Sequence, residues 1–145
     1  MISISKILGV SAVIYEKTDE ALFFLLFRRS SNLKGWESLK GKCLPNETPD
    51  AAITRIVAER IKRFTLRGAL TAKRAFKVGD DDHEFIVYLV ESFTNIPVGM
   101  AEQKKKHDNY IWLSRSEALA RLHWSEEKAV YAEAVTKINE EDSTV

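Results

Sequence analysis

The sequence predicts an α+β fold in which helices cover the faces of a mixed β-sheet. Strand-like and helical segments follow one another in the order strand, strand, loop, helix, three strands and a final helical region. The 145 residues are 45% hydrophobic, which is enough for one sizeable core. Because no linker or repeat divides the chain, we expect one domain over residues 1–139 and a polar, frayed tail at 140–145.

Two strands are expected at the start of the chain. Ile7–Tyr15 and Ala21–Arg29 are rich in Ile, Val, Leu and Phe, and the polar turn Glu16–Glu20 between them predicts a hairpin. After a polar loop at 30–35, the segment Trp36–Leu44 has the composition of a short strand that leads into a loop.

The segment Pro45–Asp50 introduces a helix. Thr48 suits the N-cap, Pro49 suits the first helical position, and Asp50 suits the positive end of the helix dipole. Apolar residues then recur at helical spacing, at Ala52, Ile53, Ile56, Val57 and Ile61. This pattern predicts a helix that ends near Arg63.

The second half of the chain adds three strands and two helices. In chain order, we expect strands at Leu66–Val78, Phe85–Phe93 and Tyr110–Leu113, a helix after Ser114 and Ser116 that runs through Arg121, and a helix over Trp124–Ile138. The acidic turn Gly79–His83 and the lysine run at 104–106 are expected to face solvent.

The composition excludes several classes of function. The 22 basic and 21 acidic residues give a net charge of +1, so no global field favours nucleic acid or a membrane surface. The N-terminus lacks a signal-peptide pattern, and the longest apolar stretch, residues 21–27, cannot span a bilayer. The single Cys43 cannot form an internal disulfide, and we interpret it as a small apolar filler. We therefore expect a cytoplasmic protein.

The most informative segment is Trp36–Arg60. It contains the pattern Gly-x5-Glu-x7-Arg-x3-Glu, formed by Gly41, Glu47, Arg55 and Glu59. An ordinary capped, amphipathic helix after a turn explains the apolar positions but not this joint spacing. The pattern resembles the Nudix box, the signature of hydrolases that cleave nucleoside diphosphates linked to another group.

Other segments resemble the branch of that family that hydrolyses diadenosine polyphosphates and ADP-ribose. They are Trp36-Glu37, Lys40-Gly41-Lys42, and Tyr110–Leu113 followed by Glu117-Ala-Leu119. The resemblance implies a Nudix α/β/α sandwich. It also implies structural roles for Gly41, which leaves room for the helix, and for Glu47 and Arg55, which pair to fix the loop on the helix.

The same resemblance implies a metal site that this chain only partly retains. The family has glutamates at three matching positions on one helix face, where this chain has Ile56, Glu59 and Arg60. Glu59 is thus the expected catalytic residue and metal ligand. We expect Mg²⁺ or Mn²⁺ to bind weakly, because Arg60 would repel the ion. Lys62 replaces a family glycine that helps end the helix.

Two features could compensate for the missing ligands. Carboxylates outside the box could complete the site, from Asp80–Asp82, Glu84, Glu91 or Glu102, although a solvent-facing turn is the simpler interpretation of the first group. Alternatively, Arg60 could contact phosphate directly, which would preserve binding without the cation.

The expected substrate-binding residues are Arg29, Trp36, Lys40 and Arg60. Trp36 has two interpretations, stacking on a base or filling the core. The resulting hypothesis is a Nudix-like hydrolase of weakened activity on a nucleotide-type small molecule. A catalytically inactive module that binds nucleotides or proteins is the alternative, and formation of a homodimer stays open.

Overall fold

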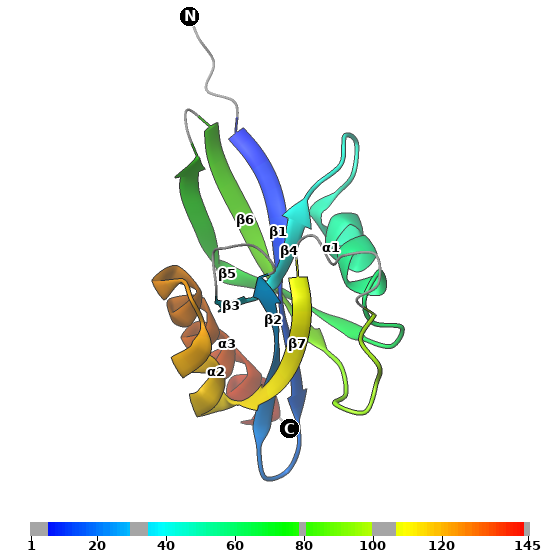
Figure 1. The fold of residues 1–145 in the computed structure, drawn as a ribbon, viewed down its shortest axis with the longest axis vertical. Coiled ribbons are helices and arrows are strands. Elements are labelled where there is room, and N and C mark those ends of the chain that lie inside the picture. The colour runs from blue at the N-terminus through cyan, green and yellow to red at the C-terminus, as the bar shows by residue number, and fades with distance from the viewer. Residues whose placement is uncertain (1–5, 30–34, 79–80, 100–106, 144–145) are drawn as a thin grey trace, which may run out of the picture.

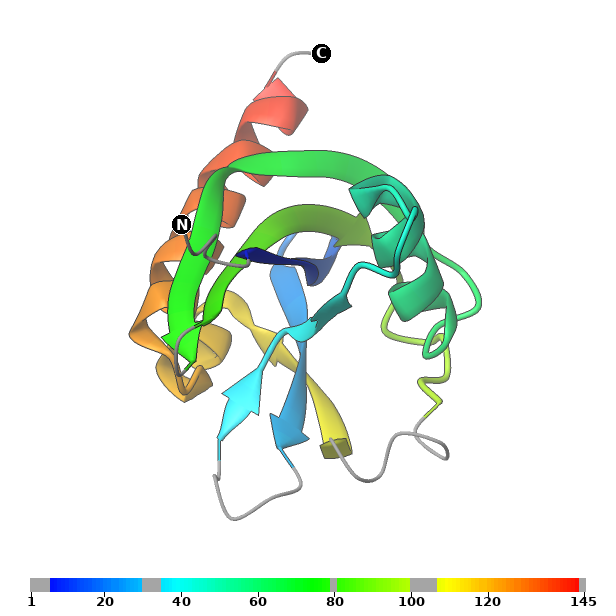
Figure 2. The same cartoon turned by 90° about the horizontal axis from the view of Figure 1, so that it is seen from above.

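The computed structural model describes residues 6–29, 35–78, 81–99 and 107–143. These residues form a mixed β-sheet with helices on both faces, which confirms the predicted fold class (Figures 1 and 2). Helix α1 (Pro49–Ala58) covers one face of the sheet. Helices α2 (Arg115–Arg121) and α3 (Ser125–Ser143) cover the other.

The sheet has seven strands within the described ranges. They are β1 (Lys6–Lys17), β2 (Leu22–Arg29), β3 (Trp36–Glu37), β4 (Leu39–Lys42), β5 (Thr65–Val78), β6 (Asp81–Glu91) and β7 (His107–Ser114). The predicted hairpin of the first two strands is confirmed, with Ile14 opposite Leu25 and Lys17 opposite Leu22. Strands β5 and β6 form the second hairpin.

Strand β1 is the centre of the sheet. One of its edges pairs in parallel with β6 over Lys6–Tyr15. Its other edge is shared, since Gly9–Ala12 pairs with β4 and Ile14–Lys17 pairs with β2. The sheet therefore divides near Val13, and β4 lies beside α1 (Figure 1).

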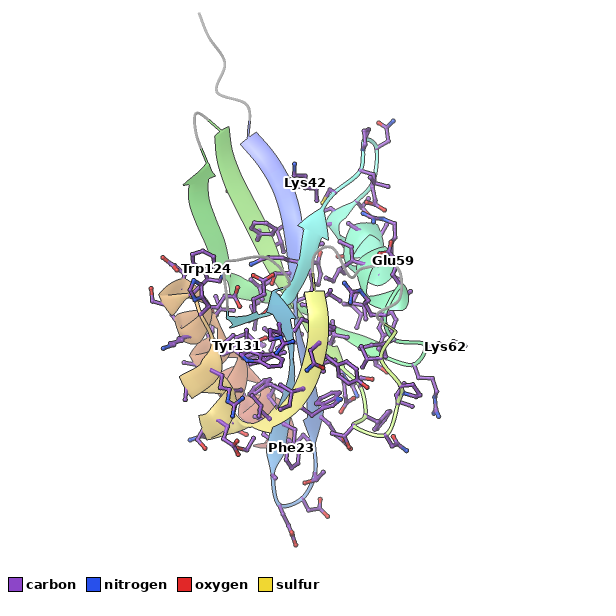
Figure 3. All side chains as sticks on the ribbon, in the orientation of Figure 1. Phe23, Lys42, Glu59, Lys62, Trp124 and Tyr131 are labelled. Atoms are coloured by element: carbon purple, nitrogen blue, oxygen red, sulfur yellow. The ribbon has the colours of Figure 1, made fainter. Side chains whose placement is uncertain are left out.

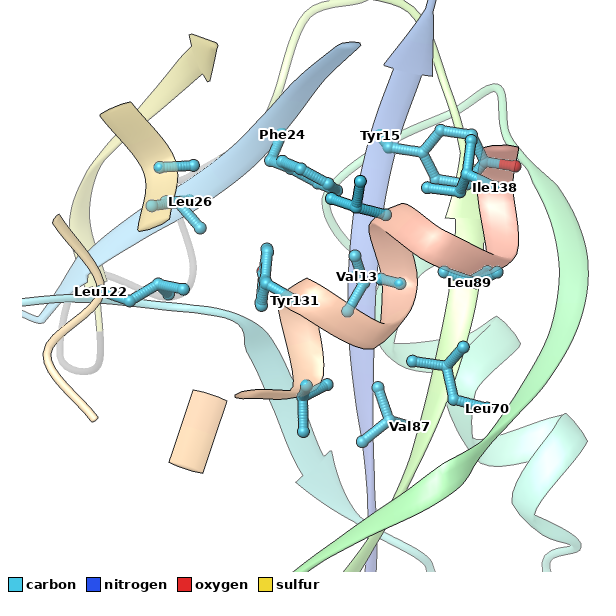
Figure 4. Packing of buried hydrophobic residues seen from close by; sticks show 14 of the residues in the cluster. Val13, Tyr15, Phe24, Leu26, Leu70, Val87, Leu89, Leu122, Tyr131 and Ile138 are labelled. Atoms are coloured by element: carbon cyan, nitrogen blue, oxygen red, sulfur yellow. The ribbon is translucent and has the colours of Figure 1, made fainter. Parts of the chain in front are cut away.

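The alternation of side chains along each strand produces two hydrophobic cores. Val13 and Phe24 pack with Tyr131 on the side of α2 and α3, where the Phe24 and Tyr131 rings meet edge to face at 5.0 Å (Figure 4). Their chain neighbours Ile14 and Leu25 pack on the opposite side, against α1. Both layers are thus held by burial of apolar surface.

Ser38 lies where the chain passes from β3, on the edge of β2, to β4, on the edge of β1. At this switch its backbone N–H donates to Glu127 Oε2 at 3.0 Å. The hydroxyls of Ser38 and Tyr131 are 2.6 Å apart. Glu127 is 2% exposed and belongs to α3, so a buried carboxylate supplies an acceptor for this N–H between the two strands.

Lys40 balances the charge of that carboxylate. Its Nζ lies 3.2 Å from Glu127 Oε1 and 3.2 Å from Glu37 Oε1, and Glu37 is also buried. Trp124 Nε1 donates to Glu37 Oε1 at 3.4 Å. Buried carboxylates require such partners, and these contacts hold the start of α3 against β3 and β4.

Two predicted helix ends are wrong. Helix α1 ends at Ala58 instead of near Arg63, because the following residues bond to another loop: Ile61 bridges to Val98, and Gly99 N–H donates to the Arg60 carbonyl at 2.7 Å. Helix α3 continues past the predicted end at Ile138 to Ser143. Glutamate is a good helix former, so the polar residues after Ile138 extend the last turns.

The strand ends also differ from prediction. Strand β6 begins at Asp81, inside the predicted turn Gly79–His83, whose first two residues lie outside the described ranges. Strand β7 begins at His107, before the predicted Tyr110, because it pairs with β2 as far as Arg29. No helix within the described residues combines the length and apolarity needed to cross a membrane.

We predict that Glu127→Ala lowers the free energy of unfolding by about 3 kcal/mol, because it leaves the Ser38 N–H and part of the Lys40 charge buried without an acceptor. Urea denaturation would measure the loss. Glu126→Ala, at the exposed neighbouring position, is the matched control and should change stability little. Equal effects of the two substitutions would contradict a structural role for this carboxylate.

Candidate functional site

The N-terminus of α1 is fixed by its cap and by the sheet. Thr48 is the N-cap, as predicted, and its Oγ1 accepts from the Ala51 N–H at 3.2 Å. Pro49 occupies the first helical turn. Asp50 Oδ1 accepts from the Tyr88 hydroxyl at 2.5 Å, which ties this end of the helix to β6. Burial and this contact raise the pKa of Tyr88, so its hydroxyl remains a donor.

Arg55 holds the loop before the helix. Its Nε donates to Glu47 Oε2 at 2.9 Å and its Nη2 donates to Glu47 Oε1 at 3.0 Å. The same Nη2 reaches the Lys42 carbonyl at 3.1 Å, and Glu47 Oε1 also accepts from the Leu44 N–H at 2.9 Å. This two-pronged contact joins the end of β4, the loop and the middle of α1.

Gly41 allows β4 to lie close to α1. A Cβ atom at this position would lie 2.7 Å from Ile56 Cδ1, which is closer than real side chains approach. Ile56 itself is buried, so the glycine and the isoleucine fill one space between strand and helix. The structure thus brings Gly41, Glu47 and Arg55 together around the loop that the sequence analysis singled out.

A pocket of about 140 Å³ opens between β4 and the C-terminal part of α1. Figure 3 labels Lys42 on the β4 side and Glu59 on the α1 side. The pocket is lined by Leu39, Lys40, Gly41, Lys42, Arg55, Ile56, Glu59 and Arg60. Four of these residues are basic and one is acidic, but the Lys40 ammonium lies against Glu37 and Glu127 on the α3 side of the sheet.

Arg60 lines this pocket and is buried, with 4% of its surface exposed. Its guanidinium carbon lies 5.3 Å from the centroid of the Phe27 ring, which is the geometry of a cation–π contact. Burial lowers the pKa of Arg60, and the neighbouring carboxylate of Glu59 partly opposes that shift. The guanidinium nevertheless keeps its positive charge at neutral pH.

The three box positions 56, 59 and 60 meet in this pocket, as helical spacing predicts. Only Glu59 presents a carboxylate, and Arg55 Nη1 lies 3.6 Å from its Oε1. The described ranges contain no cluster of three or more His, Cys, Asp or Glu that could hold a metal ion. The donor set therefore does not fit the divalent cation that the family implies.

The carboxylates outside the box that could replace the missing metal ligands either do not line the pocket or lie outside the described residues. Glu84 and Glu91 are absent from the pocket lining, and Glu91 Oε1 instead accepts from Arg67 Nε at 3.1 Å. Asp80 and Glu102 lie outside the described residues, as do the side chains of Asp81 and Asp82 in β6.

The expected substrate-binding residues have different locations. Arg60 and Lys40 line the pocket, but Lys40 Nζ also contacts the carboxylates of Glu37 and Glu127. Trp36 is partly buried against the core under α2 and α3, and it is not part of the pocket lining. Arg29 ends β2, and its side chain lies outside the described part.

Sequence reasoning missed Lys42 and the buried acids. Lys40 and Lys42 are two apart in β4, so the alternation of a strand could have assigned both to one face. No local signal indicates Glu127, which contacts Ser38 and Lys40 from the distant helix α3. At Cys43, burial and then the Glu47 carboxylate raise the pKa, so the thiol stays protonated and is a poor nucleophile.

An α/β/α sandwich, a strand–loop–helix unit fixed by an Arg–Glu pair and a polar pocket beside that helix define the class of protein. The NUDIX domain model matches residues 5–134, and the chain therefore belongs to the Nudix family. No curated protein matches the sequence at a significant level.

Solved structures share this fold at low sequence identity. An Ap4A hydrolase from C. elegans is 16% identical, with a TM-score of 0.75 over 92% of this chain and 98% of that chain. The E. coli dihydroneopterin triphosphate pyrophosphohydrolase is 18% identical, with a TM-score of 0.72 over 90% of this chain and 95% of that chain. The NUDIX domain of Shewanella oneidensis NrtR, complexed with ADP ribose, is 16% identical, with a TM-score of 0.69 over 92% of this chain and 89% of that chain.

Glu47→Gln should make stability less dependent on pH in the acidic range. Hydrogen bonds from Arg55, and then from the Leu44 N–H, lower the pKa of Glu47 below its ordinary value of 4.5. The ion pair therefore stabilises the folded chain above that pH, and its contribution is lost as the pH falls below it. Thermal unfolding should show a lower midpoint for the variant at neutral pH, and the difference should shrink in acid.

The matched control for this experiment is Glu126→Gln, which removes an exposed carboxylate at the start of α3. It should leave the pH profile close to that of the parent protein. If the unfolding midpoints of Glu47→Gln and the parent differ by the same amount at every pH, the Arg55–Glu47 pair has no electrostatic role.

Proposed function

We propose that this Nudix protein binds nucleotides in which a diphosphate is linked to a second group, and that it hydrolyses their pyrophosphate bond slowly. The observation that carries the proposal is the composition of the pocket beside α1. Four of the eight residues that line it are basic, a composition that suits phosphate, whereas the three box positions supply one carboxylate, Glu59. The related structures act on or bind Ap4A, dihydroneopterin triphosphate and ADP ribose, which supports a ligand of this class.

Glu59 is the proposed catalytic residue. Its side chain is 45% exposed and lines the pocket, so its carboxylate can accept a proton from a water molecule that attacks a bound phosphate. Arg55 Nη1 lies 3.6 Å from Glu59 Oε1 and helps to hold that carboxylate in the pocket. Because Ile56 and Arg60 supply no carboxylate, we expect slow turnover.

The alternative is a catalytically inactive module that binds a nucleotide or a protein partner. The observation that favours it is the buried position of Ile56 and Arg60, which makes both residues part of the helix–sheet contact. A cytoplasmic location is part of both versions of the proposal, on the ground of cysteine usage.

A panel of ADP-ribose, diadenosine polyphosphates and nucleoside triphosphates, each with Mg²⁺ or Mn²⁺, tests the proposal. Product formation and thermal shift would be recorded in the same samples, because a ligand that binds the folded chain raises its melting midpoint whether or not it is cleaved. We expect a shift with at least one nucleotide and slow product release. A thermal shift without product would favour the inactive module. If no nucleotide gives a thermal shift or product, both the slow hydrolase and the nucleotide-binding module are refuted.

Glu59→Gln should abolish whatever hydrolysis the parent protein shows, because the variant keeps the size of the side chain and removes the base. Product release over time is the measurement, and the thermal midpoint should stay close to that of the parent. Activity that survives unaltered would exclude Glu59 as the residue that carries it.

Ile56→Glu combined with Arg60→Glu should raise Mg²⁺ affinity and hydrolysis by roughly tenfold or more. The double variant supplies two oxygen ligands and removes a like charge, whose repulsion of a divalent ion about 4–5 Å away amounts to several kcal/mol at an effective dielectric of about 20. Calorimetric titration with Mg²⁺ and product release would measure the gain.

The matched control is Ala58→Glu combined with Lys62→Glu. It changes the net charge by the same amount at exposed positions that do not line the pocket. If both double variants gain Mg²⁺ affinity and hydrolysis equally, the cause is the change in overall charge and not new ligands in the pocket.

A further inference from the structure

We propose that the ring of Tyr110, on β7, stacks against the base of the nucleotide whose phosphates lie in the pocket beside α1. This inference rests on the proposed function and specifies which part of the surface binds the group beyond the phosphates. It starts from the size of the pocket, which is about 140 Å³. Sites that enclose a whole ligand of this size have volumes of roughly 300–1,000 Å³, so the base has to lie on a surface next to the pocket.

One side of the pocket leads towards β7. Arg60 lines the pocket, and its guanidinium carbon lies 5.3 Å from the centroid of the Phe27 ring on β2. Phe27 is directly opposite Tyr110 in the ladder between β2 and β7. Residues in such a pair project from the same face of the sheet, with Cβ atoms about 5 Å apart. Because Phe27 packs on the α1 side, Tyr110 projects on that side too, one strand beyond Phe27.

Tyr110 has the chemistry that a base requires. The large hydrophobic side chains that are exposed within the described ranges are Leu8, Leu44, Phe93 and Tyr110. Stacking on a base requires a planar group, which leaves Phe93 and Tyr110. Phe93 follows Ser92, whose N–H donates to the Tyr15 carbonyl, at the end of β1 that pairs with β2 and not with β4. Tyr110 is therefore the ring that the side of the pocket at Arg60 leads to.

The edge of the sheet at Tyr110 favours a small ligand over an added β-strand. Within the described ranges, β7 pairs only with β2. The Tyr110 N–H donates to Asn109 Oδ1 at 2.8 Å, so this backbone donor is already satisfied and is not offered to another strand. The ring itself is 36% exposed, and a base that covered it would remove apolar surface from water.

Calorimetric titration with ADP-ribose, and displacement of bound ADP-ribose by inorganic pyrophosphate, test the inference. Tyr110→Ala should weaken ADP-ribose binding roughly five- to fiftyfold, the effect of losing one stacked base. Pyrophosphate has no base, so it should bind the variant and the parent protein equally and thereby show that the variant is folded. Tyr110→Phe keeps the ring and should keep the affinity for ADP-ribose.

The matched control is Phe93→Ala, which removes a ring that is 43% exposed and does not line the pocket. It should leave both affinities unchanged. Three results would overturn the inference and leave the proposed function standing. In the first, Tyr110→Ala leaves ADP-ribose binding unchanged or weakens pyrophosphate binding equally. In the second, Tyr110→Phe weakens ADP-ribose binding as much as Tyr110→Ala does.

In the third, light scattering shows a dimer that Tyr110→Ala converts to a monomer, because the ring would then serve a contact between two copies of the chain. If the parent protein binds no nucleotide, the proposed function fails and this inference fails with it.

Discussion

The contact between Arg55 and Glu47 is the constraint on which the site depends. A single guanidinium joins the last residue of β4, the loop and the helix, with donor–acceptor distances between 2.9 and 3.1 Å. Because the pocket lies between that strand and that helix, its width follows from this contact and from the close approach at Gly41. Arg55 is thus primarily a structural residue, although it also lines the pocket, since most of its donors serve the scaffold.

The opposite face of the sheet supports the same strand. Glu127, from α3, accepts from the Ser38 N–H and from Lys40, one residue before Gly41. Strand β4 is therefore held by α1 on one side and by α3 on the other, and the acids on the α3 side, Glu37 and Glu127, are buried. Such pairs are costly to form but more costly to break singly, so they favour one position of the strand. A fixed strand presents Lys42 in a fixed place.

Local sequence signals predicted what depends on local chemistry. The first hairpin and the Thr48 cap followed from residue types next to one another in the chain, and the fold class followed from the order of elements. The end of α1 was not predictable in this way, because the residues after Ala58 pair with Val98 and Gly99, about forty positions later. The buried acids Glu37 and Glu127 were missed for the same reason, since their partners are brought close only by the folded sheet.

The substitutions at positions 56 and 60 do more than delete ligands. Ile56 is 7% exposed and fills the space that Gly41 leaves, and a buried side chain of this size contributes about 1.5–3 kcal/mol. Arg60 covers the Phe27 ring, and its carbonyl accepts from the Gly99 N–H. A glutamate at either position would lose part of this packing unless a cation compensated its charge. The residues that replace the acids therefore stabilise the helix–sheet contact without a metal, whereas an acidic version of the same surface would depend on one.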